Sequence, residues 1–257
     1  MGSRRSPHSA PNRIIRIASL SCTHAPFTDE RAFKAALRII REWDPSVLIH
    51  QGDLLEAGSA SVHPSEYQHD QRDEYEAAAA LLSKLEAVSP NAHERVWIRG
   101  NHDQNLMDPD PRRIPKSLRR AVHWSNQSDD VSSVFRRWRP IPYINSSEGA
   151  YCVGPIIFTH GFRTGANSDF LEALEFHYAT GSVPNRLVVR GHTHRPVPPT
   201  QVIFHSVPFH LHVMNVGHLG PRKPHYMGRR SSLLWGHSLG LFTVRGSRWT
   251  AKLVPLP

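Results

Sequence analysis

The chain has 257 residues, 39% of them hydrophobic and 21% charged, with a formal net charge of +9. This apolar content is enough for a folded core and excludes a wholly disordered chain, and because no run of about 18 apolar residues occurs, we expect no membrane partner. Cys22 and Cys152 are the two cysteines of the chain, too few for a disulfide framework, so we expect a reducing, cytoplasmic location.

The N-terminal half alternates between strand-like and helix-like patterns. Residues 1–12 are basic and are followed by no signal-like apolar stretch, which predicts a disordered tail. Thr28 is the expected N-cap of the first helix, because acidic residues and a helical apolar spacing follow it. The expected elements are, in chain order, a strand at 13–20, a helix at 28–43, a strand at 46–50, a helix at 66–88 and a strand at 95–99.

The sequence pattern changes in the C-terminal part, where strand-like runs are separated by proline and glycine turns. These runs lie at residues 201–205, 211–216, 232–244 and 248–254. An alternating half followed by a strand-rich half, with no linker between them, predicts an α/β fold in which two β-sheets form a sandwich flanked by helices. We expect a single domain over residues 13–257, with a basic insert at about 104–147.

Five short polar segments follow predicted strands: Cys22-Thr23-His24, Gly52-Asp53, Gly100-Asn101-His102-Asp103, His160-Gly161 and Gly191-His192-Thr193-His194. They supply imidazole, carboxylate and amide groups, which suit Mn, Fe, Zn or Ni. Loops at strand ends can bring ligands that are distant in sequence to one point. Gly52-Asp53 and His160-Gly161 alone carry little information, whereas the Gly-Asn-His-Asp and Gly-His-Thr-His segments are more specific. All five in this order indicate a metal site.

The order and spacing of these segments resemble the calcineurin-like metallophosphoesterase family over roughly residues 13–220. The resemblance implies a double-sheet α/β sandwich that holds two divalent metal ions about 3.5–4 Å apart and uses them to activate the water that hydrolyses a phosphate ester. It implies Cys22, His24, Asp53 and His194 as ligands of the first ion. For the second ion it implies Asp53, shared between both ions, with Asn101, His160 and His192.

The resemblance also implies residues that act on the substrate. His102 would face the phosphate as a general acid or as a stabiliser of charge, and Asp103 would orient it. Arg163 and Arg195 lie beside the fourth and fifth segments, which makes them candidate phosphate contacts.

Cys22 departs from the family pattern, in which this position is an aspartate. A thiolate binds zinc at about 2.3 Å and is softer than a carboxylate, so it favours Zn or Fe over Mn. Three interpretations stay open: Cys22 is a metal ligand, it leaves a first site with three protein ligands, or the protein is catalytically crippled.

The charge of the chain is unevenly distributed. Residues 176–257 contain ten basic and no acidic residues, which suggests a surface for an anion such as nucleic acid, although a solvated basic face explains the pattern equally well. In the basic insert, Trp124 and Trp138 stand among arginines. They indicate either a stacking platform for single-stranded nucleic acid or amphipathic helices with tryptophans in the core.

Two classes of function are compatible with these patterns. The first is a metal-dependent phosphoesterase that leans towards phosphodiester or nucleic-acid substrates. The alternative is a catalytically weakened metal-binding or nucleic-acid-binding scaffold of the same fold, which the cysteine at position 22 would favour. Loss of hydrolysis on Asp53→Asn would separate the enzyme from the scaffold.

Overall fold

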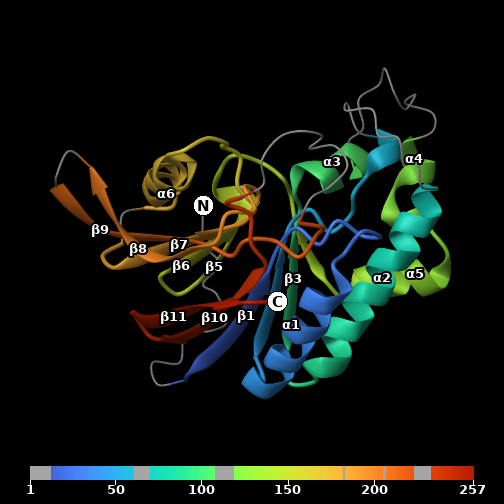
Figure 1. The fold of residues 1–257 in the computed structure, drawn as a ribbon, viewed down its shortest axis with the longest axis horizontal. Helices are drawn as coiled ribbons and strands as arrows, with labels where there is room; N and C mark the ends of the chain where they lie inside the picture. The colour runs from blue at the N-terminus through green and yellow to red at the C-terminus, as the bar shows by residue number, and fades with distance from the viewer. Residues whose placement is uncertain (1–12, 61–69, 108–118, 182, 205–206, 223–232) are drawn as a thin grey trace, which may run out of the picture.

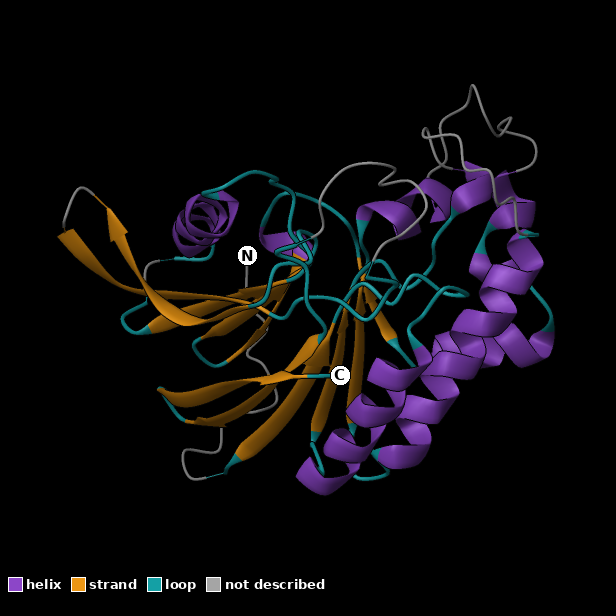
Figure 2. Cartoon of the chain, viewed as in Figure 1, coloured by secondary structure: helices purple, strands orange, loops and turns teal. Residues whose placement is uncertain are grey.

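The structure is a computed structural model that describes residues 13–60, 70–107, 119–181, 183–204, 207–222 and 233–257. Its strands form two sheets that pack face to face, with helices on both outer faces (Figure 1, Figure 2). This arrangement confirms the predicted α/β double-sheet sandwich. The predicted disordered tail, residues 1–12, lies outside the described residues.

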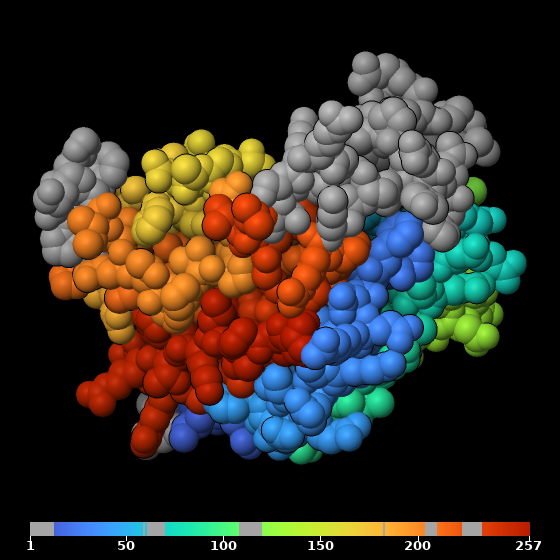
Figure 3. All heavy atoms as spheres, viewed as in Figure 1, coloured from blue at the N-terminus to red at the C-terminus, as the bar shows by residue number. Residues whose placement is uncertain are grey.

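The first sheet has the strand order β11-β10-β1-β2-β3-β4. Its strands are β1 (Ile15–Leu20), β2 (Val47–Gln51), β3 (Glu94–Ile98), β4 (Arg139–Ile141), β10 (Ser238–Arg245) and β11 (Arg248–Pro255). Strands β1 to β4 are parallel, and β10 pairs antiparallel with β1. The C-terminal strands therefore lie beside the N-terminal ones, and red and blue segments share one face of the molecule (Figure 3).

The second sheet has the order β5-β6-β7-β9-β8. Its strands are β5 (Ala150–Val153), β6 (Ile156–Thr159), β7 (Arg186–Arg190), β8 (Val197–Phe204) and β9 (Val207–Asn215). Strands β6, β7 and β9 are parallel, whereas β5 and β8 pair antiparallel at the two edges. The parallel strands of each sheet thus deliver their following loops to one end of the sandwich.

Helices cover both outer faces. The α-helices are α1 (Glu30–Trp43), α2 (Gln71–Val88), α3 (Asn101–Met107), α4 (Arg119–Val122), α5 (Asp129–Arg136) and α6 (Ser168–Ala179). Short 3-10 turns are η1 (Gly58–Ala60), η3 (Trp124–Asn126) and η4 (Ser147–Gly149). Helices α1, α2 and α5 lie on the side of the first sheet and α6 on the side of the second (Figure 1). In the described part of the chain no helix has the length and apolar character to cross a bilayer.

The helix boundaries follow local capping chemistry. The N-cap of α1 is Asp29, whose side chain accepts a hydrogen bond from the Ala32 N–H, so Thr28 is not the cap that the sequence predicts. Thr28 Oγ1 instead donates to the Thr23 carbonyl, which ties the start of the helix to the loop after β1. Asp70 caps α2 in the same way, and the first residues of the helix predicted at 66–88, residues 66–69, lie outside the described residues.

The apolar core is layered by the two sheets. Between them, side chains such as Ile17, Ile49 and Val96 meet Phe158 and Val189, all at or below 1% exposure. A second layer separates the first sheet from its helices, and a third lies between the second sheet and α6. Removing apolar surface from water contributes about 25 cal/mol of stabilising free energy for each Å², and this holds the layers together.

A buried glutamine links the two sheets near the carboxyl ends of their strands. Gln51, the last residue of β2, donates from Nε2 to the carbonyls of Thr159 and Val189, at 2.9 Å each. Its Oε1 accepts a hydrogen bond from Ser19 Oγ on β1. Because these bonds connect β1 and β2 with β6 and β7, they fix the relative position of the loops that follow those strands.

We expect Gln51→Leu to lower the free energy of unfolding by about 2 kcal/mol, because it leaves buried carbonyls without their donor. Urea denaturation measures this change. The matched control is Gln201→Leu at an exposed position of β8, which should stay within about 0.5 kcal/mol of the wild type. Equal effects of the two substitutions would contradict a structural role for the Gln51 bridge.

Candidate metal centre

The five polar segments meet at one end of the sandwich, after the carboxyl ends of parallel strands from both sheets. Open α/β sheets commonly bind ligands at this edge. The loop after β1 carries Cys22 and His24, and the loop after β2 carries Asp53. The other predicted site residues follow β3, β6 and β7: the ligand candidates Asn101, His160, His192 and His194, and the predicted catalytic residue His102. The sequence prediction that these segments follow strands therefore holds for all five.

The backbone of these loops is tightly constrained. A Cβ atom on Gly100 would lie 2.1 Å from Asp53 Oδ1, and one on Gly52 would lie 2.4 Å from His160 Nδ1, so both positions need glycine for close approach. Several candidate ligands have a positive φ although they are not glycine: Cys22 (52°), His24 (50°), Asp53 (49°), His192 (65°) and His194 (60°). Such conformations cost of order 1 kcal/mol or more and concentrate at functional sites.

The first ligand cluster consists of Cys22, His24, Asp53 and His194, all buried. Their ligand atoms all lie within 4.8 Å of one another. His24 Nε2 is 3.3 Å from His194 Nε2 and 4.0 Å from Asp53 Oδ2, so two imidazole nitrogens and a carboxylate face a common point. This is the complete residue set that the sequence predicts for the first ion.

The second ligand cluster consists of Asp53, His160 and His192, again with ligand atoms within 4.8 Å of one another. His160 Nε2 lies 3.2 Å from Asp53 Oδ2 and 3.3 Å from Asn101 Oδ1, which brings the predicted amide ligand to the same place. Asp53 belongs to both clusters. The structure thus brings together all the residues that the sequence assigns to the second ion.

The electrostatics of the clusters depend on Asp53. Burial favours the neutral acid, but the positive potential of His160, His102 and His24 outweighs it and lowers the pKa of Asp53 well below its usual value. Burial also works against a charged His160, yet the negative charge of Asp53 and its hydrogen bond raise the pKa of His160 to about 9. Asp53 and His160 therefore each favour the charged form of the other, and the site as a whole favours positive charge beside the carboxylate.

The surroundings of His192 and His194 favour the neutral form of both imidazoles. Burial, followed by the nearby His160, lowers the pKa of His192 to about 3. Burial also lowers the pKa of His194, and His218 and His24 add to this effect. A neutral imidazole is the form that binds a metal. His192 Nδ1 is buried with no partner among the described residues, which fits a nitrogen reserved for an ion.

Two of the histidines are oriented through their second ring nitrogen. His160 Nδ1 lies 2.7 Å from the Gln51 carbonyl, so it donates there and leaves Nε2 for the cluster. His24 Nδ1 lies 2.8 Å from Glu56 Oε2, with the same consequence. A metal-binding histidine usually has such an outer partner, which fixes the tautomer. Glu56 was not among the predicted site residues, although it stands three positions after Asp53.

The thiol of Cys22 is at the position where the family has a carboxylate. The side chain is fully buried, with Sγ 3.0 Å from Ser21 Oγ and 4.0 Å from Asp53 Oδ2. Sulfur therefore points into the first cluster rather than into the apolar core. This placement favours the metal-ligand interpretation of Cys22 over the other two.

His102 lies at the edge of the clusters, with its side chain about one-fifth exposed (21%). Its backbone N–H donates to Asp53 Oδ1 at 3.0 Å, and its Nδ1 is 2.6 Å from the Glu56 carbonyl and 3.9 Å from Glu56 Oε2. Nδ1 is therefore held by Glu56, and the opposite nitrogen is available to a substrate.

Asp103 has a different place from the one that the sequence predicts. Its buried carboxylate accepts hydrogen bonds from the N–H groups of Gly100 and Leu55 and from Trp97 Nε1, at 2.8 to 3.3 Å. It therefore connects the loops after β2 and β3, while the partner that orients the His102 ring is Glu56.

Two more buried carboxylates hold ligand loops through backbone N–H groups. Glu74 of α2 accepts from residues 57–58, after Asp53, and burial raises its pKa to about 7. Glu172 of α6 accepts from residues 162–163, after His160, at 3.1 Å. Arg190, fully buried before the last ligand segment, pairs with Glu172 at 3.1 Å. The sequence reasoning missed these residues, since none belongs to a recognisable motif.

The two predicted phosphate contacts differ in availability. Arg163 Nε donates to Glu175 Oε2 at 3.0 Å, and its Nη2 also contacts Glu175, so this guanidinium already has a carboxylate partner. Arg195 Nη1 donates to the Gly165 carbonyl at 3.3 Å. Arg195 therefore stays the better candidate of the two.

The two tryptophans of the basic insert, Trp124 and Trp138, pack against other residues of the protein. Trp138 is 1% exposed and donates from Nε1 to Glu86 at 2.9 Å. Trp124 stacks on Phe135, with ring centroids 5.9 Å apart. The structure favours the core interpretation over a stacking platform, and the basic residues within 108–118 lie outside the described part.

Comparison with known proteins agrees with this geometry. A family model described as calcineurin-like phosphoesterase matches residues 15–196, which include every segment of both clusters. Among curated proteins, the Gene 54 protein of Mycobacterium phage D29 is 27% identical, with 94% of this chain and 93% of the relative covered. The Gene 54 protein of Mycobacterium phage L5 is 24% identical over the same shares.

Solved structures with a similar arrangement of elements include the phosphoesterase YfcE from E. coli, with 13% identity, a TM-score of 0.43 and 95% and 100% of the two chains covered. Another is Vps29 from Entamoeba histolytica in complex with zinc, with 11% identity, a TM-score of 0.46 and 94% and 99% covered. Because the family model spans most of the sequence, this chain belongs to the calcineurin-like phosphoesterase family.

Proposed function

We propose that this protein is a metal-dependent phosphoesterase that hydrolyses its substrate at two divalent ions sharing Asp53. The observation that carries the proposal is the position of Asp53, which belongs to both ligand clusters and whose Oδ2 lies 3.2 Å from His160 and 4.0 Å from His24. When bound, such ions supply Lewis acidity towards phosphoryl oxygens and lower the pKa of water.

The residues divide into two coordination sets. Cys22, His24 and His194 would hold one ion with Asp53, and Asn101, His160 and His192 would hold the other. The first set offers a thiolate and two imidazoles, which favour Zn or Fe, whereas the second offers amide and imidazole groups that also suit Mn or Ni. The buried Nδ1 of His192, which has no partner among the described residues, supports the fit.

His102 is the residue best placed to act on the leaving group. Glu56 holds its Nδ1, its backbone N–H binds Asp53, and its ring is partly exposed at the edge of the clusters. Nε2 can therefore give a proton to the leaving oxygen or stabilise its charge, an effect worth about 10²–10⁴-fold in general acid catalysis. Asp103 contributes indirectly, because it fixes the loops that carry Asp53 and His102.

We propose a phosphate ester as the substrate, with a lean towards phosphodiesters or nucleic acid that rests on the net charge of +9 and on the acid-free residues 176–257. Part of the positive charge is internal, because Arg190 pairs with Asp169 and Glu172. The second candidate function is a binding scaffold without turnover, and the observation that favours it is the cysteine in the first cluster.

Asp53→Asn should reduce hydrolysis of a chromogenic phosphodiester at least 100-fold in protein loaded with Mn, Zn, Fe or Ni, because the amide removes the negative charge that both clusters share. The matched control is Asp130→Asn at an exposed position of α5, which should keep wild-type activity. Hydrolysis by Asp53→Asn at the wild-type rate would contradict the shared-carboxylate site.

Cys22→Asp should shift the preferred ion from Zn or Fe towards Mn, because a carboxylate is the harder ligand. The ratio of hydrolysis rates with Mn and with Zn measures the shift, and Cys152→Ser on β5 serves as the control that should leave this ratio unchanged. If the wild type is inactive with every ion and Cys22→Asp gains activity, the scaffold function is correct and the natural protein is not an enzyme.

A further inference from the structure

One more residue reaches the ligand edge of the first sheet. Strands β1, β2 and β3 are parallel and are followed by candidate ligands, and β4 is parallel to β3. The loop after β4 therefore emerges at the same edge, and its second residue is Tyr143. Topology places this tyrosine beside the metal centre, although it lies in the stretch that the sequence marks as a basic insert.

The ring of Tyr143 is held against the second ligand cluster. It meets the His160 ring edge to face, with centroids 5.8 Å apart and 69° between the planes. It also stacks on Phe162, two residues after His160, at 4.3 Å and 20°. Phe162 in turn stacks on Phe176 of α6 at 6.3 Å. These contacts fix the ring on the side of the second cluster and leave it half-buried.

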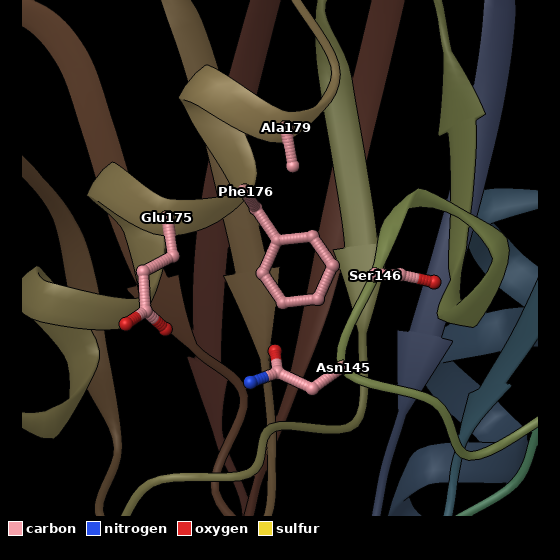
Figure 4. Close-up of a pocket in the computed structure, with 5 residues that line it drawn as sticks. All are labelled: Asn145, Ser146, Glu175, Phe176 and Ala179. Atoms are coloured by element: carbon pink, nitrogen blue, oxygen red, sulfur yellow. The ribbon is translucent and has the colours of Figure 1, made fainter.

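The loop that carries Tyr143 is a tight turn. The Ile144 N–H donates to the Pro142 carbonyl, and a Cβ at Gly149 would lie 1.9 Å from the Ile144 carbonyl oxygen, so the loop closes on itself there. Beyond the turn, a pocket of about 210 Å³ separates it from α6 (Figure 4). The residues that line this pocket are Asn145, Ser146, Glu175, Phe176 and Ala179, and none of them belongs to a ligand cluster.

Packing of the ring leaves the phenol oxygen of Tyr143 unengaged. This oxygen makes no hydrogen bond to another described residue and is not among the fully buried atoms, so a ligand can reach it. Because its ring contacts His160, the phenol lies beside the second ligand cluster and offers a hydrogen-bond donor there.

We propose that Tyr143 is a substrate-binding residue, whose hydroxyl donates a hydrogen bond to a phosphoryl oxygen of the ester held at the Asp53, His160 and His192 side of the centre. This inference rests on the proposed phosphoesterase function and names a further contact in the same site. It also supplies a donor near His160 where Arg163, the sequence candidate, is engaged by Glu175.

The test compares Tyr143→Phe with the wild type, both loaded with the same ion. The substitution keeps the ring and its stacking on Phe162 but removes the hydroxyl. We expect the dissociation constant for inorganic phosphate, measured by calorimetry, to rise about tenfold, and KM for a chromogenic phosphodiester to rise by a similar factor. Metal content and thermal midpoint should be unchanged. Tyr178→Phe, at an exposed position of α6, is the matched control and should bind phosphate like the wild type.

Phosphate affinities of Tyr143→Phe and the wild type that agree within twofold would overturn the role of the hydroxyl. If Asp53→Asn still abolishes hydrolysis in that case, the proposed phosphoesterase function stands and only the Tyr143 contact is wrong. If metal-loaded wild-type protein neither binds phosphate nor hydrolyses the ester, the proposed function and the Tyr143 contact both fail.

Discussion

The carboxylate of Asp53 is buried to 2% exposure between imidazoles that come from both sheets. His24 reaches it from the loop after β1, and His160 reaches it from the loop after β6 in the other sheet. An uncompensated carboxylate at this depth would be strongly destabilising, so cations or protonated imidazoles must accompany it. The packing of the two sheets and the binding of positive charge therefore depend on each other. The imidazoles of His24 and His160 come from different sheets, so they reach Asp53 together only when the two sheets are packed face to face.

The convergence of loops on this carboxylate is maintained by buried polar groups rather than by the apolar layers alone. Gln51 links the ends of strands in both sheets, and Asp103, Glu74 and Glu172 each hold a ligand loop through its backbone N–H groups. Apolar packing brings the sheets together but does not by itself fix the positions of the ligand loops to within tenths of an ångström. These directional hydrogen bonds provide that precision, and several of the ligands they position have left-handed backbone conformations.

Much of this arrangement could be predicted from the sequence, because ligand segments after strands carry a local signal. The strands at 47–51 and 94–98 and the residues of both clusters are examples. Glu56, Arg190 and Tyr143 could not be found in this way, since their roles arise only when distant loops meet. Asp103 shows the converse, because its neighbour in sequence is His102, whereas its partners in space are the backbone N–H of Gly100 in its own segment and that of Leu55 in the loop after β2.

Anomalous X-ray diffraction from crystals grown with zinc would test the shared-carboxylate centre most directly. We expect two zinc peaks on either side of Asp53, one bonded to Cys22 sulfur at about 2.3 Å and the other beside His160 and His192. A single peak, or two peaks that do not share Asp53, would contradict the account. A first peak without sulfur would show that Cys22 leaves a site with three protein ligands.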